Sequence, residues 1–115
     1  MLDSLREIAW VKNALKEFEK FPLEAKRKIL GDLTLAAEGE KGDISKPLKG
    51  LGVGVFEVAL KYRKDAYRTV YALQIDEKIW VVHVFKKKSK TGIKTSQKEM
   101  DLIKSRIKLL KNMKS

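Results

Sequence analysis

Apolar and polar residues alternate along three segments in the second half of the chain, which is the pattern of β-strands. These segments are Val55–Tyr62, Tyr67–Ile75 and Lys78–Phe85, and they are rich in Val, Ile, Tyr, Phe and Trp. Lys64-Asp65 and Asp76-Glu77 separate them and predict short turns, which favour an antiparallel meander. The last segment contains IWVVHVF, which is almost continuously apolar, so we expect an interior strand covered on both faces.

Residues 6–39 show the spacing of helices instead. Lys12–Lys20 suits a short helix, and Arg6–Val11 before it suits either a short strand or the start of a helix. Pro22 fits the first position of a second helix, and Gly39 fits its end. An apolar stripe is predicted along this second helix: Leu23, Ile29, Leu30, Leu33, Ala36 and Ala37. The two helices together predict a helical hairpin.

A connection and a final helix complete the predicted elements. Residues 40–54, EKGDISKPLKGLGVG, hold four glycines and one of the two prolines, and they predict turns. Thr95 or Ser96 can cap the final helix, and Glu99 is placed for a capping box with Ser96. Its predicted apolar stripe is Met100, Ile103, Ile107 and Leu110.

This order of elements predicts an α+β fold, with N-terminal helices, a three- to four-stranded antiparallel sheet and a C-terminal helix. The chain has 115 residues, so we expect one domain over residues 1–115. There is no cysteine and one histidine, which excludes disulfides, thiolate catalysis and cysteine-ligated zinc. We therefore expect no metal site and no cofactor. The sequence shows neither a signal peptide nor an apolar run of membrane-spanning length, so we expect a cytoplasmic protein without a membrane partner.

The net charge of +11 changes this picture because it is unevenly distributed. Residues 1–60 carry ten Lys/Arg and ten Asp/Glu, whereas residues 61–115 carry sixteen and five. A charge excess confined to one half of a chain suits an anionic partner, and nucleic acid is the commonest such partner. An anionic membrane surface and an acidic protein are the alternatives.

The strongest basic segment is Lys86–Lys98, KKKSKTGIKTSQK, which has six lysines and no acidic residue. It begins at the end of a predicted buried strand, so its first lysines are held rigidly and can contact phosphates. The alternative interpretation is a solvated loop that resists aggregation.

Four side chains within the predicted sheet are further candidates. Arg68, in the middle of YRTVY, can clamp a scissile phosphate or pair with Glu57 on the adjacent strand. Alternation predicts that His83 shares one face of the last strand with Val81 and Phe85, which suits a half-buried core histidine better than a catalytic one. Two tyrosines of one strand face, at positions 67 and 71, can stack on bases or simply pack the sheet.

Several of these segments occur together in one known family. KPLKGLGVGVFEVAL, AYRTVYAL and VVHVFKKKSKTGIKTSQKEMDLIKSRIK resemble the phage-derived Gp49-like branch of HigB toxins, within the RelE/ParE toxin superfamily. The matching positions are Lys46 to Gly50, Glu57-Val58, Tyr67 to Tyr71, His83 to Lys88 and Ser89 to Ser96. The sequence departs from the family at Ser96, where the subgroup has proline, and at Ala59, where other branches have arginine.

The resemblance implies the toxin of a type II toxin–antitoxin system, a ribosome-dependent mRNA endonuclease that needs no metal. It implies that Arg68, Lys87 and Lys88 contact the phosphate during catalysis, with Glu57 and His83 in supporting roles. The side chains expected to hold RNA are Lys86, Lys90, Lys94, Lys98 and Tyr71. The implied partners are mRNA on the ribosome and a small helix-turn-helix antitoxin. A non-enzymatic nucleic-acid-binding module and a ParE-like gyrase inhibitor are the competing hypotheses.

Overall fold

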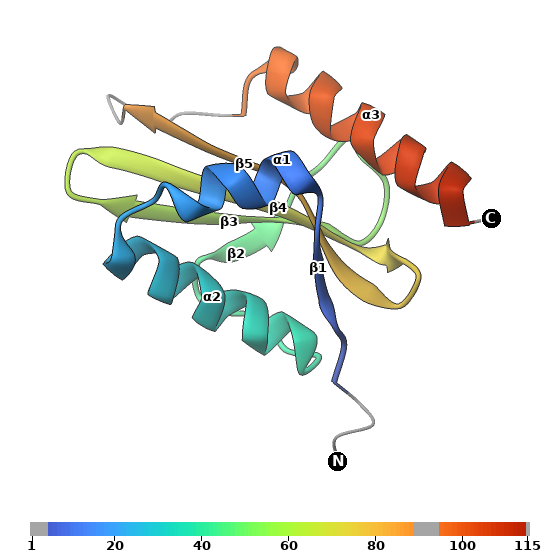
Figure 1. Cartoon of the computed structure of the whole chain (residues 1–115), viewed down its shortest axis with the longest axis horizontal. Helices are drawn as coiled ribbons and strands as arrows, with labels where there is room; N and C mark the ends of the chain where they lie inside the picture. Colours follow the sequence, from blue (N-terminus) through green and yellow to red (C-terminus); the bar gives the residue numbers. More distant parts are fainter. Residues whose placement is uncertain (1–4, 89–94, 115) are drawn as a thin grey trace.

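A five-stranded sheet with three helices forms the fold in the computed structural model, which describes residues 5–88 and 95–114 (Figure 1). The strands are β1 (Ile8–Trp10), β2 (Ser45–Pro47), β3 (Val55–Tyr62), β4 (Asp65–Ile75) and β5 (Lys78–Lys88). The helices are α1 (Lys12–Glu19), α2 (Leu23–Ala37) and α3 (Gln97–Lys114). The strand order is β1-β5-β4-β3-β2. The α+β class is therefore confirmed.

The antiparallel meander of β3, β4 and β5 is confirmed. Asp76 and Glu77 link β4 to β5 with φ of 56° and 53°, the left-handed pair that a two-residue hairpin turn requires. The preceding turn lies one residue earlier than predicted, because Asp65 already pairs with Tyr62 and Arg63 has a φ of 59°. As expected, β5 is an interior strand.

The sheet is larger than predicted, because two three-residue strands extend it at its edges. β1 runs parallel to β5, with Ile8 opposite Ile79, so the strand alternative for Arg6–Val11 is confirmed. β2 pairs antiparallel with β3, with Lys46 opposite Glu57, inside the segment predicted to be only a connection. A three-residue strand is too short to show a period of two, so neither strand has a clear signature in the sequence.

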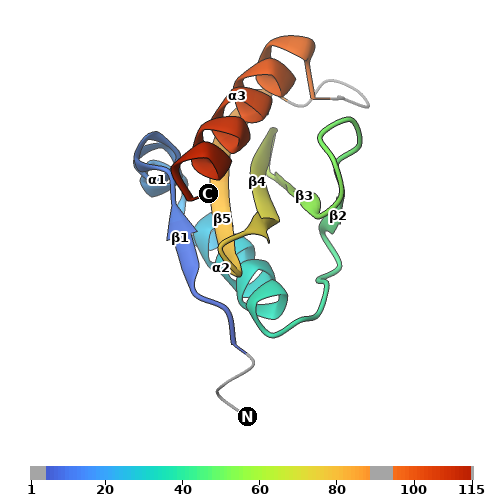
Figure 2. The same ribbon diagram turned by 90° about the vertical axis from the view of Figure 1, so that its right-hand side faces the viewer.

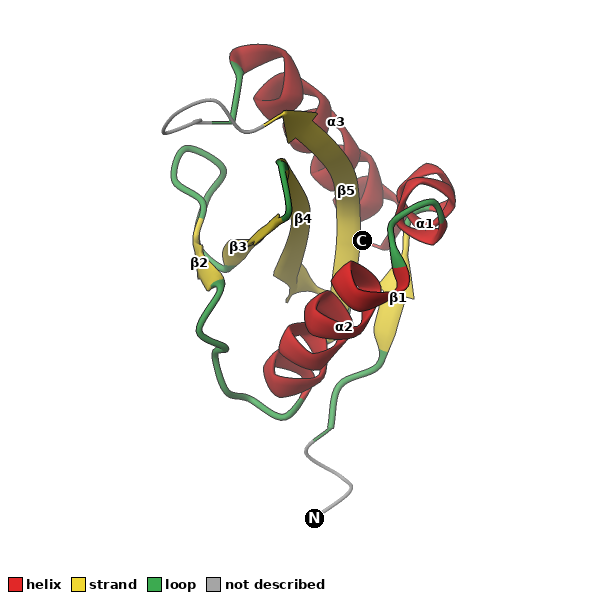
Figure 3. Ribbon diagram, turned by 90° about the vertical axis from the view of Figure 1, so that its left-hand side faces the viewer, coloured by secondary structure: helices red, strands yellow, loops and turns green. Residues whose placement is uncertain are grey.

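The helices cover opposite faces of this sheet (Figures 2 and 3). α1 and α2 pack on one face, in a cluster with Phe18, Ile29, Leu33, Tyr67 and Tyr71. α3 packs on the other face, in a cluster with Val70, Val82, Phe85, Ile103 and Ile107. The meander therefore has a helical layer on each side, which explains why β5 is apolar along most of its length.

Two residues of the predicted α2 stripe are not in the core. The side chains of Leu23 and Leu30 are 60% and 40% exposed, whereas Ala25, Ile29 and Leu33 are buried at intervals of four residues. Pro22 is the N-cap of α2, so the helix begins one residue later than predicted.

The part of the chain that the structure describes contains no helix with both the length and the apolarity to cross a bilayer.

The packing of α3 gives a stability prediction. Ile103 is fully buried against the sheet, whereas its neighbour Leu102 is 39% exposed. We expect Ile103→Ala to lower the free energy of unfolding by about 2–5 kcal/mol, because it leaves a cavity. The matched variant Leu102→Ala should lose about 1 kcal/mol or less. Urea unfolding followed by circular dichroism measures both, and equal losses would contradict this packing of α3.

Candidate functional site

Four of the sequence-predicted site residues lie on the side of the sheet that α3 covers, which we call the α3 face. Residues paired directly across two strands share a face, and Arg68 of β4 pairs with Phe85 of β5. Alternation along β5 places Lys87 on the same face. His83 stacks on Phe85 with ring centroids 4.9 Å apart, so it also lies there. Glu57 reaches the same face from β3.

Val81 does not share this face, contrary to the sequence prediction. It belongs to the cluster on the α1 and α2 side, whereas Phe85 belongs to the cluster under α3. The cause is a register shift between β4 and β5: Val70 pairs with His83, but Tyr71 pairs with Val81. The extra residue in β5 reverses the alternation.

Arg68 and Glu57 form a buried ion pair, as the cross-strand interpretation predicted. Arg68 Nη1 lies 3.2 Å from Glu57 Oε1, and the two side chains are 11% and 2% exposed. Thr95, which precedes α3, donates its hydroxyl hydrogen to Glu57 Oε2 at 2.6 Å. One oxygen of the Glu57 carboxylate therefore binds Arg68 of β4, and the other binds Thr95, just before α3. Removing one member of a buried pair leaves an uncompensated charge, so this contact holds Arg68 in a defined position.

Lys87 continues the same row of side chains towards the end of β5. Its ammonium nitrogen lies 5.7 Å from the centre of the Phe85 ring, a distance typical of a cation–π contact. Its side chain is half-buried. The α3 face therefore presents Lys87, Phe85 and His83 in sequence along β5, with Arg68 beside Phe85.

His83 is held between two charged residues of α3. Its Nε2 lies 2.5 Å from Glu99 Oε1, and its Nδ1 lies 3.2 Å from Arg106 Nη1. A guanidinium only donates hydrogen bonds, so Nδ1 accepts from Arg106. Nε2 therefore carries the ring proton and donates a hydrogen bond to Glu99 Oε1. Burial lowers the pKa of His83, and the hydrogen bond and charge of Glu99 oppose that shift. The imidazole is therefore neutral at physiological pH.

Sequence reasoning missed Arg106 and the role of Glu99. Arg106 Nη1 also donates to the carbonyl oxygen of Val82 at 2.8 Å. Ser96 caps α3 by accepting the backbone N–H of Glu99 at 3.3 Å, but the carboxylate of Glu99 binds His83. The spacing of seven residues between Glu99 and Arg106 places them on one helix face, which is the signal that was available.

Lys86 and Tyr71 lie on the opposite side of the sheet. Lys86 pairs with Tyr67 across the strands and is exposed, 3.8 Å from the carboxylate of Asp65. Tyr71 is 2% exposed, and its hydroxyl lies 3.0 Å from the hydroxyl of Ser45. The expectation that Tyr71 stacks on RNA bases is corrected here, because its ring is almost fully buried and already stacks on Phe56.

The remaining predicted lysines are only partly described. Lys98 is exposed in the first turn of α3. Lys90 and Lys94 lie outside the described residues, and only the backbone of Lys88 is described. Among the described residues, no group of three or more His, Cys, Asp or Glu side chains is placed to hold a metal ion.

The lowered pKa of His83 predicts a loss of stability in acid. The ordinary pKa of histidine is about 6.5, so below that pH the unfolded chain binds a proton that the folded chain resists. The free energy of unfolding of the natural sequence should therefore fall as the pH is lowered from about 7 through about 6.5 and below. His83→Gln should reduce this slope. Urea unfolding across this pH range measures both proteins, and equal slopes would show that His83 does not resist protonation.

The comparisons with known proteins agree with this fold. Residues 16–108 match the family model described as phage-derived protein Gp49-like. A mutant of the Escherichia coli toxin RelE in the free state superposes with a TM-score of 0.65 and 22% identity, over 90% of this chain and 98% of that one. The isolated E. coli RelE toxin superposes with a TM-score of 0.56 and 24% identity, over 87% of this chain and 97% of that one. No curated protein matches the sequence. The chain thus has the fold of RelE and belongs to the phage-derived Gp49-like family.

Proposed function

We propose that this protein is the toxin of a type II toxin–antitoxin system and cleaves mRNA on the ribosome without a metal ion. The observation that carries the proposal is the convergence of Arg68, Lys87 and His83 on the α3 face. The fold shared with RelE toxins supports the toxin class, and the basic second half of the chain supports an RNA substrate.

In the proposed reaction, the 2′-oxygen of a ribose attacks the adjacent phosphorus while the bond from phosphorus to the 5′-oxygen breaks. The 2′-hydroxyl loses a proton and the leaving oxygen gains one. Negative charge accumulates on the phosphate oxygens between these events. Arg68 and Lys87 supply positive charge for those oxygens, and Lys88 is proposed to assist them.

The pairing with Glu57 suits Arg68 to this task. A guanidinium that is already fixed in place loses little entropy when it contacts the reacting phosphate. Glu57 also compensates the cost of holding that charge in a buried site.

His83 is proposed to support the site by position. In the described arrangement Nε2 donates to Glu99 and Nδ1 accepts from Arg106, so both ring nitrogens are engaged. The imidazole stacks on Phe85, which in turn carries Lys87 on its ring. His83 therefore acts on Lys87 through Phe85 and need not exchange a proton with the substrate.

The proposed partners follow from the charge distribution. Lys86, Lys90, Lys94 and Lys98 are proposed to hold ribosomal and messenger RNA around the cleaved bond. A small helix-turn-helix antitoxin is proposed to cover the basic face and so silence the toxin.

A non-enzymatic RNA-binding module is the second candidate, and the buried ion pair of Arg68 with Glu57 favours it. In that case Arg68 serves the fold alone. Such a module would bind RNA with strong salt dependence and give no cleavage even with ribosomes present.

Lys87→Met tests the catalytic proposal, with Lys28→Met as its matched control. Both variants remove one positive charge, but Lys28 is exposed on α2, on the other side of the sheet. We expect Lys87→Met to reduce the cleavage rate by about 10²-fold or more, as when one transition-state donor is lost. Lys28→Met should cut normally. The cleavage rate is measured by incubating purified protein with ribosomes and a defined message and mapping the new 5′ ends.

Intact messages in the presence of ribosomes and the natural protein would contradict the endonuclease proposal. Equal cleavage by the Lys87 and Lys28 variants would contradict the catalytic role of Lys87.

Arg68 requires a design that separates folding from chemistry. Arg68→Ala leaves the buried Glu57 carboxylate unpaired and should cost about 3–5 kcal/mol of stability. The double variant Arg68→Gln with Glu57→Gln removes both charges and should regain part of that stability. We expect the double variant to fold and yet to cleave no RNA, as urea unfolding and the ribosome assay would show. Cleavage by a folded double variant would assign Arg68 to the fold alone.

A further inference from the structure

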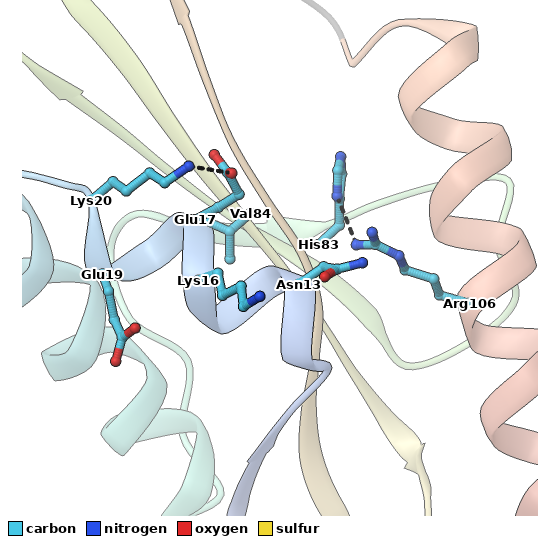
Figure 4. A pocket seen from close by; sticks show the side chains of 8 residues that line it. All are labelled: Asn13, Lys16, Glu17, Glu19, Lys20, His83, Val84 and Arg106. Atoms are coloured by element: carbon cyan, nitrogen blue, oxygen red, sulfur yellow. Dashed lines mark hydrogen bonds and ion pairs between the residues drawn. The ribbon is translucent and has the colours of Figure 1, made fainter.

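A pocket of about 480 Å³ lies between α1, β5 and α3, at the edge of the sheet (Figure 4). β1 pairs with β5 only as far as Val81. Beyond that point no described strand continues on this side of β5, and His83 and Val84 line the pocket. The pocket therefore lies beside β5, beyond the end of β1 and next to α1.

Hydrogen-bond donors converge on this pocket from two helices. Asn13 and Lys16 reach it from α1, and Arg106 reaches it from α3 on the opposite side (Figure 4). Arg106 Nη1 is committed to Val82 and His83, while the guanidinium has five N–H donors in total. Within the described residues, the side chains of Asn13 and Lys16 make no hydrogen bond or ion pair. Three donors that face one space are suited to an anion with several oxygens.

The acidic side chains around the pocket do not cancel this charge. Glu17 is paired with Lys20 at 3.1 Å, so these two residues neutralise each other. Glu19 also lines the pocket, but it lies at the end farthest from Arg106 (Figure 4). Glu99 is hydrogen-bonded to the neutral imidazole of His83, and its negative charge offsets part of the positive charge of Arg106. Among the described residues, Lys16 has no acidic partner, and Arg106 is compensated only in part.

The burial of Arg106 also favours anion binding at this pocket. Burial lowers the pKa of its guanidinium, and the negative charge of Glu99 offsets this only in part. A second anion in the pocket would stabilise the charged form. The pocket therefore has a cation whose desolvation an incoming anion can compensate.

We propose that this pocket is a second anion site, which binds a backbone phosphate of the RNA away from the cleaved bond. The choice of RNA rests on the proposed function, whereas the affinity for a phosphate group does not. His83 lines the pocket and also lies in the row that leads to Lys87. Four residues of β-strand separate them, or about 13 Å, so a short RNA segment spans both places.

The first experiment titrates inorganic phosphate, and separately a short single-stranded RNA, into the whole protein and follows its NMR spectrum. Both ligands should shift the side-chain amide of Asn13 and the Nε–H of Arg106. The double variant Asn13→Ala with Lys16→Met should weaken phosphate binding about tenfold, the effect of one lost charge-assisted contact. The control Lys12→Met changes the same charge on α1, at an exposed residue that does not line the pocket.

The second experiment measures RNA affinity against salt concentration. Losing one phosphate contact should reduce the slope of log affinity against log salt by about 0.7 in the double variant. Lys12→Met should leave that slope unchanged. Equal effects of the two variants, or no phosphate shifts at Asn13 and Arg106, would overturn the site.

The outcomes also separate this site from the proposed function. If phosphate binds at the pocket but the protein cuts no message, the anion site is supported and the endonuclease proposal is wrong. If an acidic peptide depends on Lys16 for binding and RNA does not, the assignment to RNA is wrong.

Discussion

The buried carboxylate of Glu57 is the contact on which the arrangement of the α3 face depends. It lies on β3, is almost fully enclosed, and binds Arg68 of β4 and Thr95 before α3. A buried carboxylate is costly unless its oxygens are paired, so the fold is stable only when both partners are in place. One side chain therefore fixes a cation in the middle of the sheet and the point from which α3 starts.

The position of that start determines the rest of the site. Ser96 caps α3 one residue after Thr95, and Glu99 then reaches His83. Two helical turns further on, Arg106 contacts the other nitrogen of the same imidazole. The sheet and helix are thus joined at two places, by Glu57 and by His83, with apolar packing between and beyond them. This arrangement gives a cationic surface with defined positions, which flexible surface lysines alone do not provide.

Long strands and helices could be predicted from the sequence because they are periodic. Contacts between the sheet and the helices that cover it could not be predicted. The meander and the Arg68–Glu57 pair followed from alternation, because cross-strand partners are fixed once a hairpin register is known. β1 and β2 were too short to show a period. Tyr71 was placed on the right strand face, but alternation does not reveal that α2 covers that face. Arg106 was missed, because its partner His83 lies on another element and no pattern within the helix points to that histidine.

The division of charge along the chain needs a similar revision. The first half has no net charge, so the division of charge alone predicts no part for it in binding an anion. Yet α1 contributes Asn13 and Lys16 to the pocket, opposite Arg106 from the basic half. Glu17 of this helix pairs with Lys20, the C-cap residue, which balances part of its charge at the pocket. What an anion meets is the local balance of unpaired side chains, so a segment that is neutral in total can still form half of an anion site.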